Sequence, residues 1–334
     1  MRKGKQTLVF EQAPYIIDTA SVVGKKEGEG PLGMYFDKVD ETNLFDKKTW
    51  EEAEAEMQRL ACVMTLEKAK VNKEKVHHLF GGDLLRQGIA TTMGIAELSI
   101  PLFGLFGACS TSGEALTLSA MSVAAGYGNH VLAVTSSHFA TAEKEFRFPL
   151  GYANQRPKAS SWTVTGSAAF LVGKRASHVR ISGATIGKVV DYGMKDSQNM
   201  GACMAPAACD TIYQHLVDLK EQPESYDKII TGDLGHIGSE ILLDLLSQKG
   251  IDISQQHMDC GVEMFDQATQ NTNAGGSGCG CAATTLSAYI LPKIKEGIWK
   301  KVLFVPTGAL MSTVSYNEGL TVPGIAHGVL MEYC

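Results

Sequence analysis

The sequence lacks any apolar run of the roughly 18 residues that a membrane-spanning helix needs, and no apolar signal segment follows its basic start. We therefore expect a soluble chain with neither a signal peptide nor a transmembrane segment. Basic residues form no cluster beyond Arg2, Lys3 and Lys5, and the formal net charge is −6. These two features argue against a nucleic-acid-binding surface.

Paired Cys-x-x-Cys spacings are also missing, although the chain has eight cysteines. The closest pair, Cys279 and Cys281, lacks the companion ligands of a tetrahedral zinc site. Several cysteines lie in apolar or small-residue segments, which is typical of buried free thiols in a reducing compartment. We expect no structural metal and no cofactor. The cysteines are Cys62, Cys109, Cys203, Cys209, Cys260, Cys279, Cys281 and Cys334.

The composition that is present is typical of a globular protein: 44% of residues are apolar, 20% are charged, and 35 are glycines. So many glycines imply numerous tight turns between strands and helices. A chain of 334 residues exceeds the usual size of a single core. Two domains, or one large α/β unit containing a duplication, would both fit this length.

An internal duplication organises the chain. Residues 80–84 (Phe-Gly-Gly-Asp-Leu) match 230–234 (Ile-Thr-Gly-Asp-Leu), and each follows an apolar run. The sequence Thr-Leu-Ser-Ala occurs at 117–120 and again at 285–288, each time in a predicted helix that leads to a strand. These later strands are 131–134 and 302–305, followed by final strands at 166–172 and 326–331.

The alternation of strands and helices predicts an α/β fold with parallel-rich sheets covered by helices. We place the boundary between the halves at about residue 178, giving 1–178 and 179–334, packed face to face. Residues 138–162 form an irregular excursion beside a site or an interface. Residues 25–48 are predicted to be an exposed loop, followed by an amphipathic helix over 50–70. The excursion contains Phe146, Phe148, Pro149, Tyr152 and Pro157.

Cys109 lies at a predicted helix start. Residues 102–106 are a short apolar strand, and 107–113 (Gly-Ala-Cys-Ser-Thr-Ser-Gly) form the turn into a helix over 114–125. A helix start offers unpaired N–H groups and a positive dipole end, which lower a thiol pKa and attract carboxylates. A small buried residue at a strand–helix junction explains the same pattern equally well.

The duplication places Ser277 opposite Cys109, within 273–278 (Asn-Ala-Gly-Gly-Ser-Gly). A second glycine-rich helix start therefore corresponds to the first. If a pseudo-two-fold axis relates the halves, both helix starts point into one crevice. Such a crevice would suit a ligand with two acidic groups.

These features resemble the thiolase superfamily, in which a duplicated five-layered α-β-α-β-α fold places a nucleophilic cysteine at a buried helix start. Cys109 within Ala-Cys-Ser matches that cysteine. The superfamily's histidine is displaced here to His236, and Asn273 begins the segment that replaces the thiolase Gly-His-Pro turn. The second thiolase cysteine has no counterpart in 307–312. The resemblance excludes a biosynthetic thiolase, and leaves as an alternative a ketoacyl-synthase-like acyl-transfer or condensing enzyme with Cys109, His236 and Asn273 as catalytic residues.

Over its full length, including Gly-Ser-Gly-Cys-Gly-Cys at 276–281, the chain resembles the stage V sporulation protein AD family of spore-forming bacilli. The resemblance implies non-catalytic binding of dipicolinic acid, free or as its calcium chelate. The acid would be taken into the forespore and released in germination, with the other stage V sporulation A membrane proteins as partners. It also implies a peripheral location at the spore inner membrane, and a homodimer formed through strand 131–136.

The resemblance and the helix starts together indicate which residues contact the ligand. Cys109, Ser277 and Gly278 are expected closest to it, and His236 can donate to a carboxylate. Asp233 is interpreted mainly as a turn or helix-cap residue, like its duplicate Asp83. The complete predicted set is Cys109, Asp191, Asn199, His236, Asn273, Ser277, Gly278 and Ser312.

Overall fold

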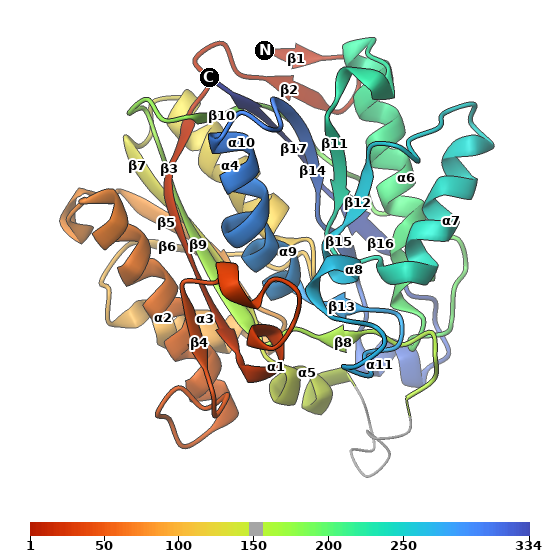
Figure 1. Ribbon diagram of the computed structural model, residues 1–334, viewed down its shortest axis with the longest axis horizontal. Helices are drawn as coiled ribbons and strands as arrows, with labels where there is room; N and C mark the ends of the chain where they lie inside the picture. Colours follow the sequence, from red (N-terminus) through yellow and green to blue (C-terminus); the bar gives the residue numbers. More distant parts are fainter. Residues whose placement is uncertain (147–155) are drawn as a thin grey trace.

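Two sets of strands with the same order and directions form the centre of the molecule (Figure 1). The computed structural model describes residues 1–146 and 156–334. The first set consists, in spatial order, of β3 (Tyr15–Gly24), β9 (Gly166–Gly173), β7 (His130–Ser137), β5 (His78–Gly82) and β6 (Leu102–Gly104). The second consists of β10 (Val179–Thr185), β17 (Gly328–Tyr333), β14 (Lys301–Val305), β11 (Lys228–Thr231) and β12 (His257–Asp259).

The strand directions repeat between the two sets. β9 is antiparallel to both β3 and β7, and β5 runs parallel to β7 and β6. In the same way, β17 is antiparallel to β10 and β14, and β11 runs parallel to β14 and β12. The sets meet where Arg180 of β10 pairs with Tyr15 of β3. The boundary expected near residue 178 falls between β9 and β10.

Helices lie outside and between the two sets of strands. The outer helices are α2 (Trp50–Ala69) and α3 (Ile89–Ala96) on the first set, and α6 (Met200–Leu219) and α7 (Gly235–Ser247) on the second. The inner layer consists of α4 (Thr111–Ala124), α9 (Cys279–Thr285), the π-helical turn η6 (Leu286–Ile290) and α10 (Leu291–Lys295). Buried side chains such as Leu116, Phe170 and Phe304 join this inner layer to both sets in one core. The α/β fold expected from the sequence is confirmed.

Short elements complete the described residues. The helices and helical turns are α1 (Lys25–Gly28), η1 (Gly33–Tyr35), η2 (Lys73–Lys75), η3 (Arg86–Gly88), α5 (Phe139–Phe146), η5 (Pro223–Ser225), α8 (Cys260–Met264) and α11 (Thr313–Asn317). The strands are β1 (Arg2–Lys3), β2 (Thr7–Val9), β4 (Lys38–Asp40), β8 (Trp162–Thr163), β13 (Gly276–Ser277), β15 (Thr307–Ala309) and β16 (Gly324–Ala326). No helix among residues 1–146 and 156–334 is long and apolar enough to cross a membrane.

Several local predictions can be compared with these elements. The helix expected over 50–70 is α2, and Thr49 begins it with a capping box to Glu52. The helix expected at 114–125 starts three residues earlier, at Thr111. Residues 25–48 are not a plain exposed loop, because they contain α1 and β4 and bury three apolar side chains, those of Leu32, Phe36 and Phe45. Of the excursion residues, Phe148, Pro149 and Tyr152 lie outside the described residues.

The homodimer strand predicted at 131–136 is wrong. These residues belong to β7, which pairs with β5 on one side and with β9 on the other. Both edges of β7 therefore already have hydrogen-bond partners, and no second copy could pair with it. The open edge of the first set is β6, where Leu102 and Phe103 are exposed.

Candidate functional site

Cys109 lies in a tight turn between β6 and α4. The backbone at Ala108 is left-handed (φ 49°), and the hydroxyl of Thr111 bridges the turn by accepting from Gly107 N and donating to Ala108 O. Gly308 of β15 packs against this turn so closely that a Cβ there would lie 2.3 Å from Gly107 O. The second half of the chain thus fixes the position of Cys109, whose side chain is buried.

The second glycine-rich helix start lies directly beside the first. Gly278, with φ at 103°, precedes the first residue of α9 and adopts a conformation that favours glycine. The Cys109 Sγ and Ser277 Oγ atoms are 3.9 Å apart. The two helix starts matched in the sequence therefore meet in space.

A buried carboxyl group sits between the two helix starts. Asp233 accepts from Ser277 Oγ at 2.8 Å, from Gly278 N at 2.9 Å and from Thr307 Oγ1 at 2.7 Å. The donors expected to be free for a ligand are thus already engaged by the protein's own carboxyl. Burial raises the pKa of Asp233 despite these three donors.

The same carboxyl affects the thiol. Burial, and then the negative charge of Asp233, raise the pKa of Cys109 well above the ordinary thiol range. The helix start acts in the opposite direction, because its dipole favours a thiolate. Burial and Asp233 outweigh it here, so Cys109 is held as a neutral thiol.

Asp233 does not have the local cap role of its duplicate. Asp83 accepts from Leu85 N and from the backbone and hydroxyl of Thr91, all within eight residues of it. In the second half, Asp259 takes over this kind of contact, accepting from the backbone N–H groups of residues 234 and 235 just before α7. The interpretation of Asp233 as a cap shared by both halves is therefore wrong.

Apolar and thiol side chains, most of them from the first half, surround Cys109. Cys109 packs with Leu84, Ala142, Cys279 and Phe146. Behind Cys279, the buried Glu54 carboxyl accepts from the hydroxyls of residues 136 and 141. Burial and the neighbouring residue 83 carboxyl raise the pKa of Glu54, which favours its neutral form.

His236 and Asn273 belong to two segments that meet through a backbone hydrogen bond. The backbone N–H of His236 donates to Ala274 O at 2.9 Å, next to Asn273, whose amide donates to Ser160 Oγ. Both side chains are half-buried. Within the described part of the chain, no hydrogen bond joins the His236 ring to Cys109, and the ionisable group that contacts the thiol is the Asp233 carboxyl.

Asp191, Asn199 and Ser312 make local contacts instead. Asp191 is exposed and accepts from Gly193 N and Thr321 Oγ1. Asn199 accepts from the backbone at the start of α6, and Ser312 does the same at the start of α11. Among the described residues, none of their hydrogen bonds reaches Cys109, Asp233 or Ser277. Their ligand roles stay predictions.

Sequence reasoning missed residues whose partners are distant along the chain, namely Glu54, Asp259 and Thr307. The repeated Gly-Asp-Leu motif marked Asp233 but could not show its partners. Residues 1–146 and 156–334 contain no group of three His, Cys, Asp or Glu side chains placed to hold a metal ion. Seven of the eight cysteines are buried, and Cys334 is exposed.

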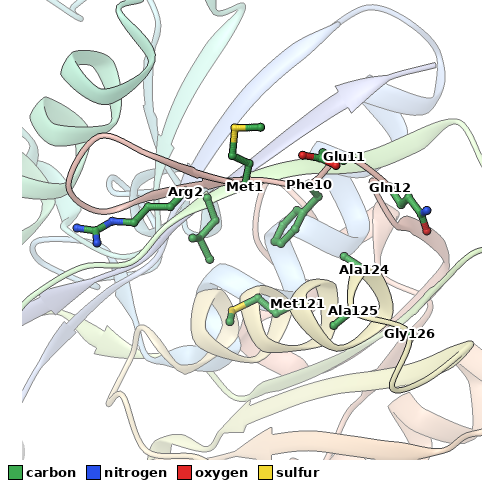
Figure 2. A pocket seen from close by; sticks show the side chains of 10 residues that line it. Met1, Arg2, Phe10, Glu11, Gln12, Met121, Ala124, Ala125 and Gly126 are labelled. Atoms are coloured by element: carbon green, nitrogen blue, oxygen red, sulfur yellow. The ribbon is translucent and has the colours of Figure 1, made fainter.

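A large cavity lies away from these residues. It has a volume of about 650 Å³ and opens between the N-terminal strands and the end of α4 (Figure 2). Because α4 has 14 residues, this end is about 20 Å from Cys109. The cavity is lined by Met1, Arg2, Leu8, Phe10, Glu11, Gln12, Met121, Ala124, Ala125 and Gly126.

Comparisons with known proteins cover nearly the whole chain. The profile of the family described as "Stage V sporulation protein AD (SpoVAD)" matches residues 4–332. The stage V sporulation protein AD of Bacillus subtilis (strain 168) is 41% identical over 329 residues, which are 98% of this chain and 97% of that protein.

Solved structures with the same fold are far less similar in sequence. The 3-oxoacyl-[acyl-carrier-protein] synthase III from Aquifex aeolicus VF5 has a TM-score of 0.58 at 15% identity, over 96% of this chain and 100% of that chain. A variant of OleA from Xanthomonas campestris has a TM-score of 0.64 at 14% identity, over 100% of both chains. These likenesses concern the fold, and they confirm the thiolase-like fold expected from the sequence.

We expect Cys109 in the native protein to react with iodoacetamide at pH 8 far more slowly than the exposed Cys334, because its thiol is buried and protonated. Asp233→Asn removes a neighbouring negative charge, so the pKa of Cys109 should fall and its alkylation should accelerate on the order of tenfold. Timed alkylation followed by peptide mass spectrometry measures both rates.

Asp83→Asn is the matched control, since it removes the corresponding buried carboxyl of the first half without touching a partner of Cys109. Circular dichroism would establish that each variant is folded. Unchanged Cys109 reactivity in folded Asp233→Asn protein would contradict the role given to Asp233.

Proposed function

The chain belongs to the stage V sporulation protein AD family, and we propose that it binds dipicolinic acid, pyridine-2,6-dicarboxylate, without catalysing a reaction on it. In this proposal the protein serves uptake of the acid into the forespore and its release in germination. It works with other stage V sporulation A proteins of the membrane, as a peripheral protein at the spore inner membrane.

The observation that carries the non-catalytic part is the environment of Cys109. Nucleophilic catalysis needs a thiolate or an adjacent base that can remove the thiol proton. Here burial and Asp233 raise the pKa of the thiol, so no thiolate is present near neutral pH, and the Asp233 carboxyl already accepts hydrogen bonds from Ser277, Gly278 and Thr307. The His236 ring makes no hydrogen bond to Cys109 within the described residues.

Binding of a dianion at the helix starts has to account for the charge of Asp233. Because burial raises the pKa of this carboxyl, the approach of a ligand carboxylate would favour its protonated form. Protonated Asp233 is a weaker acceptor, so the hydroxyl of Ser277 can rotate toward the ligand and the fixed N–H of Gly278 can be shared with it. Binding would then take up a proton and weaken as the pH rises.

We expect the purified protein to bind dipicolinate ten- to a hundredfold more tightly than pyridine-2-carboxylate, since losing one carboxylate leaves one set of charge-assisted donors unpaired. Ser277→Leu and Cys109→Leu should each block the crevice, and His236→Ala should weaken binding. Calorimetry measures these affinities, with and without calcium to distinguish the free acid from the chelate.

The control is Tyr127→Ala, because this side chain is 78% exposed just beyond the far end of α4. It should bind dipicolinate as the unmodified chain does. Equal affinity for the mono- and dicarboxylate, or full binding by both crevice variants, would place the ligand elsewhere.

An acyl-transfer or condensing enzyme is the second candidate, favoured by a cysteine at the α4 start in a fold shared with known synthases. In that case Cys109 would accept the acyl group, with His236 and Asn273 beside it. We expect no burst of free coenzyme A when the protein is mixed with acetyl- or malonyl-coenzyme A, because the thiol is buried and protonated and the His236 ring makes no hydrogen bond to it within the described residues. A burst that disappears in Cys109→Ala would establish the enzyme instead.

We also propose a homodimer, formed through the open edge of β6 rather than through β7. Leu102, Phe103 and Phe106 are 37%, 58% and 52% exposed along this edge, and Ile89 and Met93 of the neighbouring α3 are 42% and 41% exposed. An edge strand with exposed apolar side chains is suited to pairing with its own copy about a two-fold axis.

We expect sedimentation at micromolar concentration to show a dimer, and Phe103→Glu to convert it to a monomer, since the substitution places two like charges across the two-fold axis. Tyr127→Glu adds the same charge to an exposed aromatic position on another element and should leave the dimer intact. A monomeric unmodified chain would rule out the interface.

A further inference from the structure

A row of aromatic side chains crosses the surface beside α10. The ring centres of Tyr35 and Tyr289 are 5.8 Å apart, and those of Tyr289 and Trp299 are 6.0 Å apart. The Lys293 ammonium lies 5.4 Å from the Tyr289 ring. Tyr35 comes from η1, Tyr289 from the π-helical turn η6, Lys293 from α10 and Trp299 from the segment that follows α10. We call them, together with Met34 and Ile298, the α10 surface.

The α10 surface is anchored on one side and open on the other. Tyr289 and Trp299 are half-buried and pack against the central core. The flanking side chains are open to solvent, because Met34 is 84%, Tyr35 is 47% and Ile298 is 55% exposed. A contiguous exposed patch of this kind marks an interaction surface more often than scattered apolar residues do.

Lysines recur in the chain segment that carries this surface, a grouping that the sequence pattern alone did not single out. Residues 292–301 (Pro-Lys-Ile-Lys-Glu-Gly-Ile-Trp-Lys-Lys) contain four lysines and one glutamate in a chain whose net charge is −6. Lys295 pairs with Asp18 and Lys301 pairs with Glu221. Lys293 and Lys300 form no ion pair with any described residue, so their charges are available to a partner.

We propose that the α10 surface docks on an anionic lipid bilayer, in the headgroup zone. Tyrosine and tryptophan favour this zone because one end of each side chain is apolar and the other is polar. Lysine can lay its apolar stem along the lipid while its ammonium meets phosphate. Basic, aromatic and aliphatic residues interleaved on an exposed surface fit this environment better than they fit a specific phosphate site, for which the rigid fork of arginine is suited.

This inference deepens the proposed peripheral location and rests on it, but it does not depend on dipicolinate binding. From Cys279 to Lys295, α9, η6 and α10 follow one another without interruption. At about 1.5 Å per residue, the α10 surface lies on the order of 15 to 25 Å from the helix start beside Cys109. Lipid contact there would leave the Cys109 region clear of the bilayer surface.

The test uses the full chain and vesicles of phosphatidylglycerol and phosphatidylcholine in equal parts, with pure phosphatidylcholine vesicles for comparison. We expect cosedimentation with the anionic vesicles at 50 mM salt and its loss at 500 mM. Trp299 should show a blue shift of its fluorescence and quenching by brominated lipid, and Trp299→Phe should remove most of this signal while retaining the cosedimentation.

Lys293→Gln combined with Lys300→Gln should weaken vesicle binding roughly tenfold or more, since each lysine near an anionic surface contributes to the affinity. Lys70→Gln combined with Lys75→Gln is the matched control, which removes the same charge around η2 and should bind normally. Loss of binding in both double variants alike, or in neither, would overturn the proposal, as would equal binding to both kinds of vesicle.

Dipicolinate calorimetry on the same preparations separates this inference from the proposed ligand. A Lys293 and Lys300 variant that loses vesicle binding but keeps dipicolinate affinity supports the α10 surface as a separate docking site. An unmodified chain that binds anionic vesicles but not dipicolinate retains the docking surface and defeats the ligand proposal. An unmodified chain that binds dipicolinate but no vesicle supports the ligand proposal and overturns the docking surface.

Discussion

The carboxyl of Asp233 is the contact on which the centre of the molecule depends. It joins three segments that are distant along the chain, through Ser277, Gly278 and Thr307. A buried carboxyl without such donors would be costly, so these three segments of the second half have to come together when Asp233 is buried. Gly308 of the same half then packs on the Cys109 turn of the first half. The two helix starts therefore have one fixed arrangement.

That arrangement occurs in a fold that this chain shares with known synthases. The Aquifex synthase and the Xanthomonas OleA share the architecture at 15% and 14% identity. In this chain Cys109 is retained at the helix start, but its proton is held by burial and by Asp233. A shared fold does not fix the chemistry of a residue placed within it, which is why function has to be argued from the site itself.

The outer surface divides into regions with different properties. The β6 edge combines a strand that has one open side with exposed phenylalanines, a combination suited to strand pairing. The α10 surface combines aromatic rings with lysines, and the unpaired Lys293 and Lys300 give it a positive charge in an otherwise acidic protein. Because the two regions lie on different elements, association with a second copy and contact with a bilayer could occur together.

The sequence by itself determined the α/β class, the duplication and the correspondence between Cys109 and Ser277, because local patterns and repeated motifs carry this information. It could not determine the position of each strand in its sheet. The valine-rich run of β7 fits a central strand as well as an interface strand, and only pairing on both sides showed which it is. Likewise, the Gly-Asp-Leu repeat suggested one role for Asp83 and Asp233. Tertiary structure gave them different roles, because the partners of Asp83 lie within eight residues of it, whereas those of Asp233 are 44 to 74 residues away and meet it only when the second half folds.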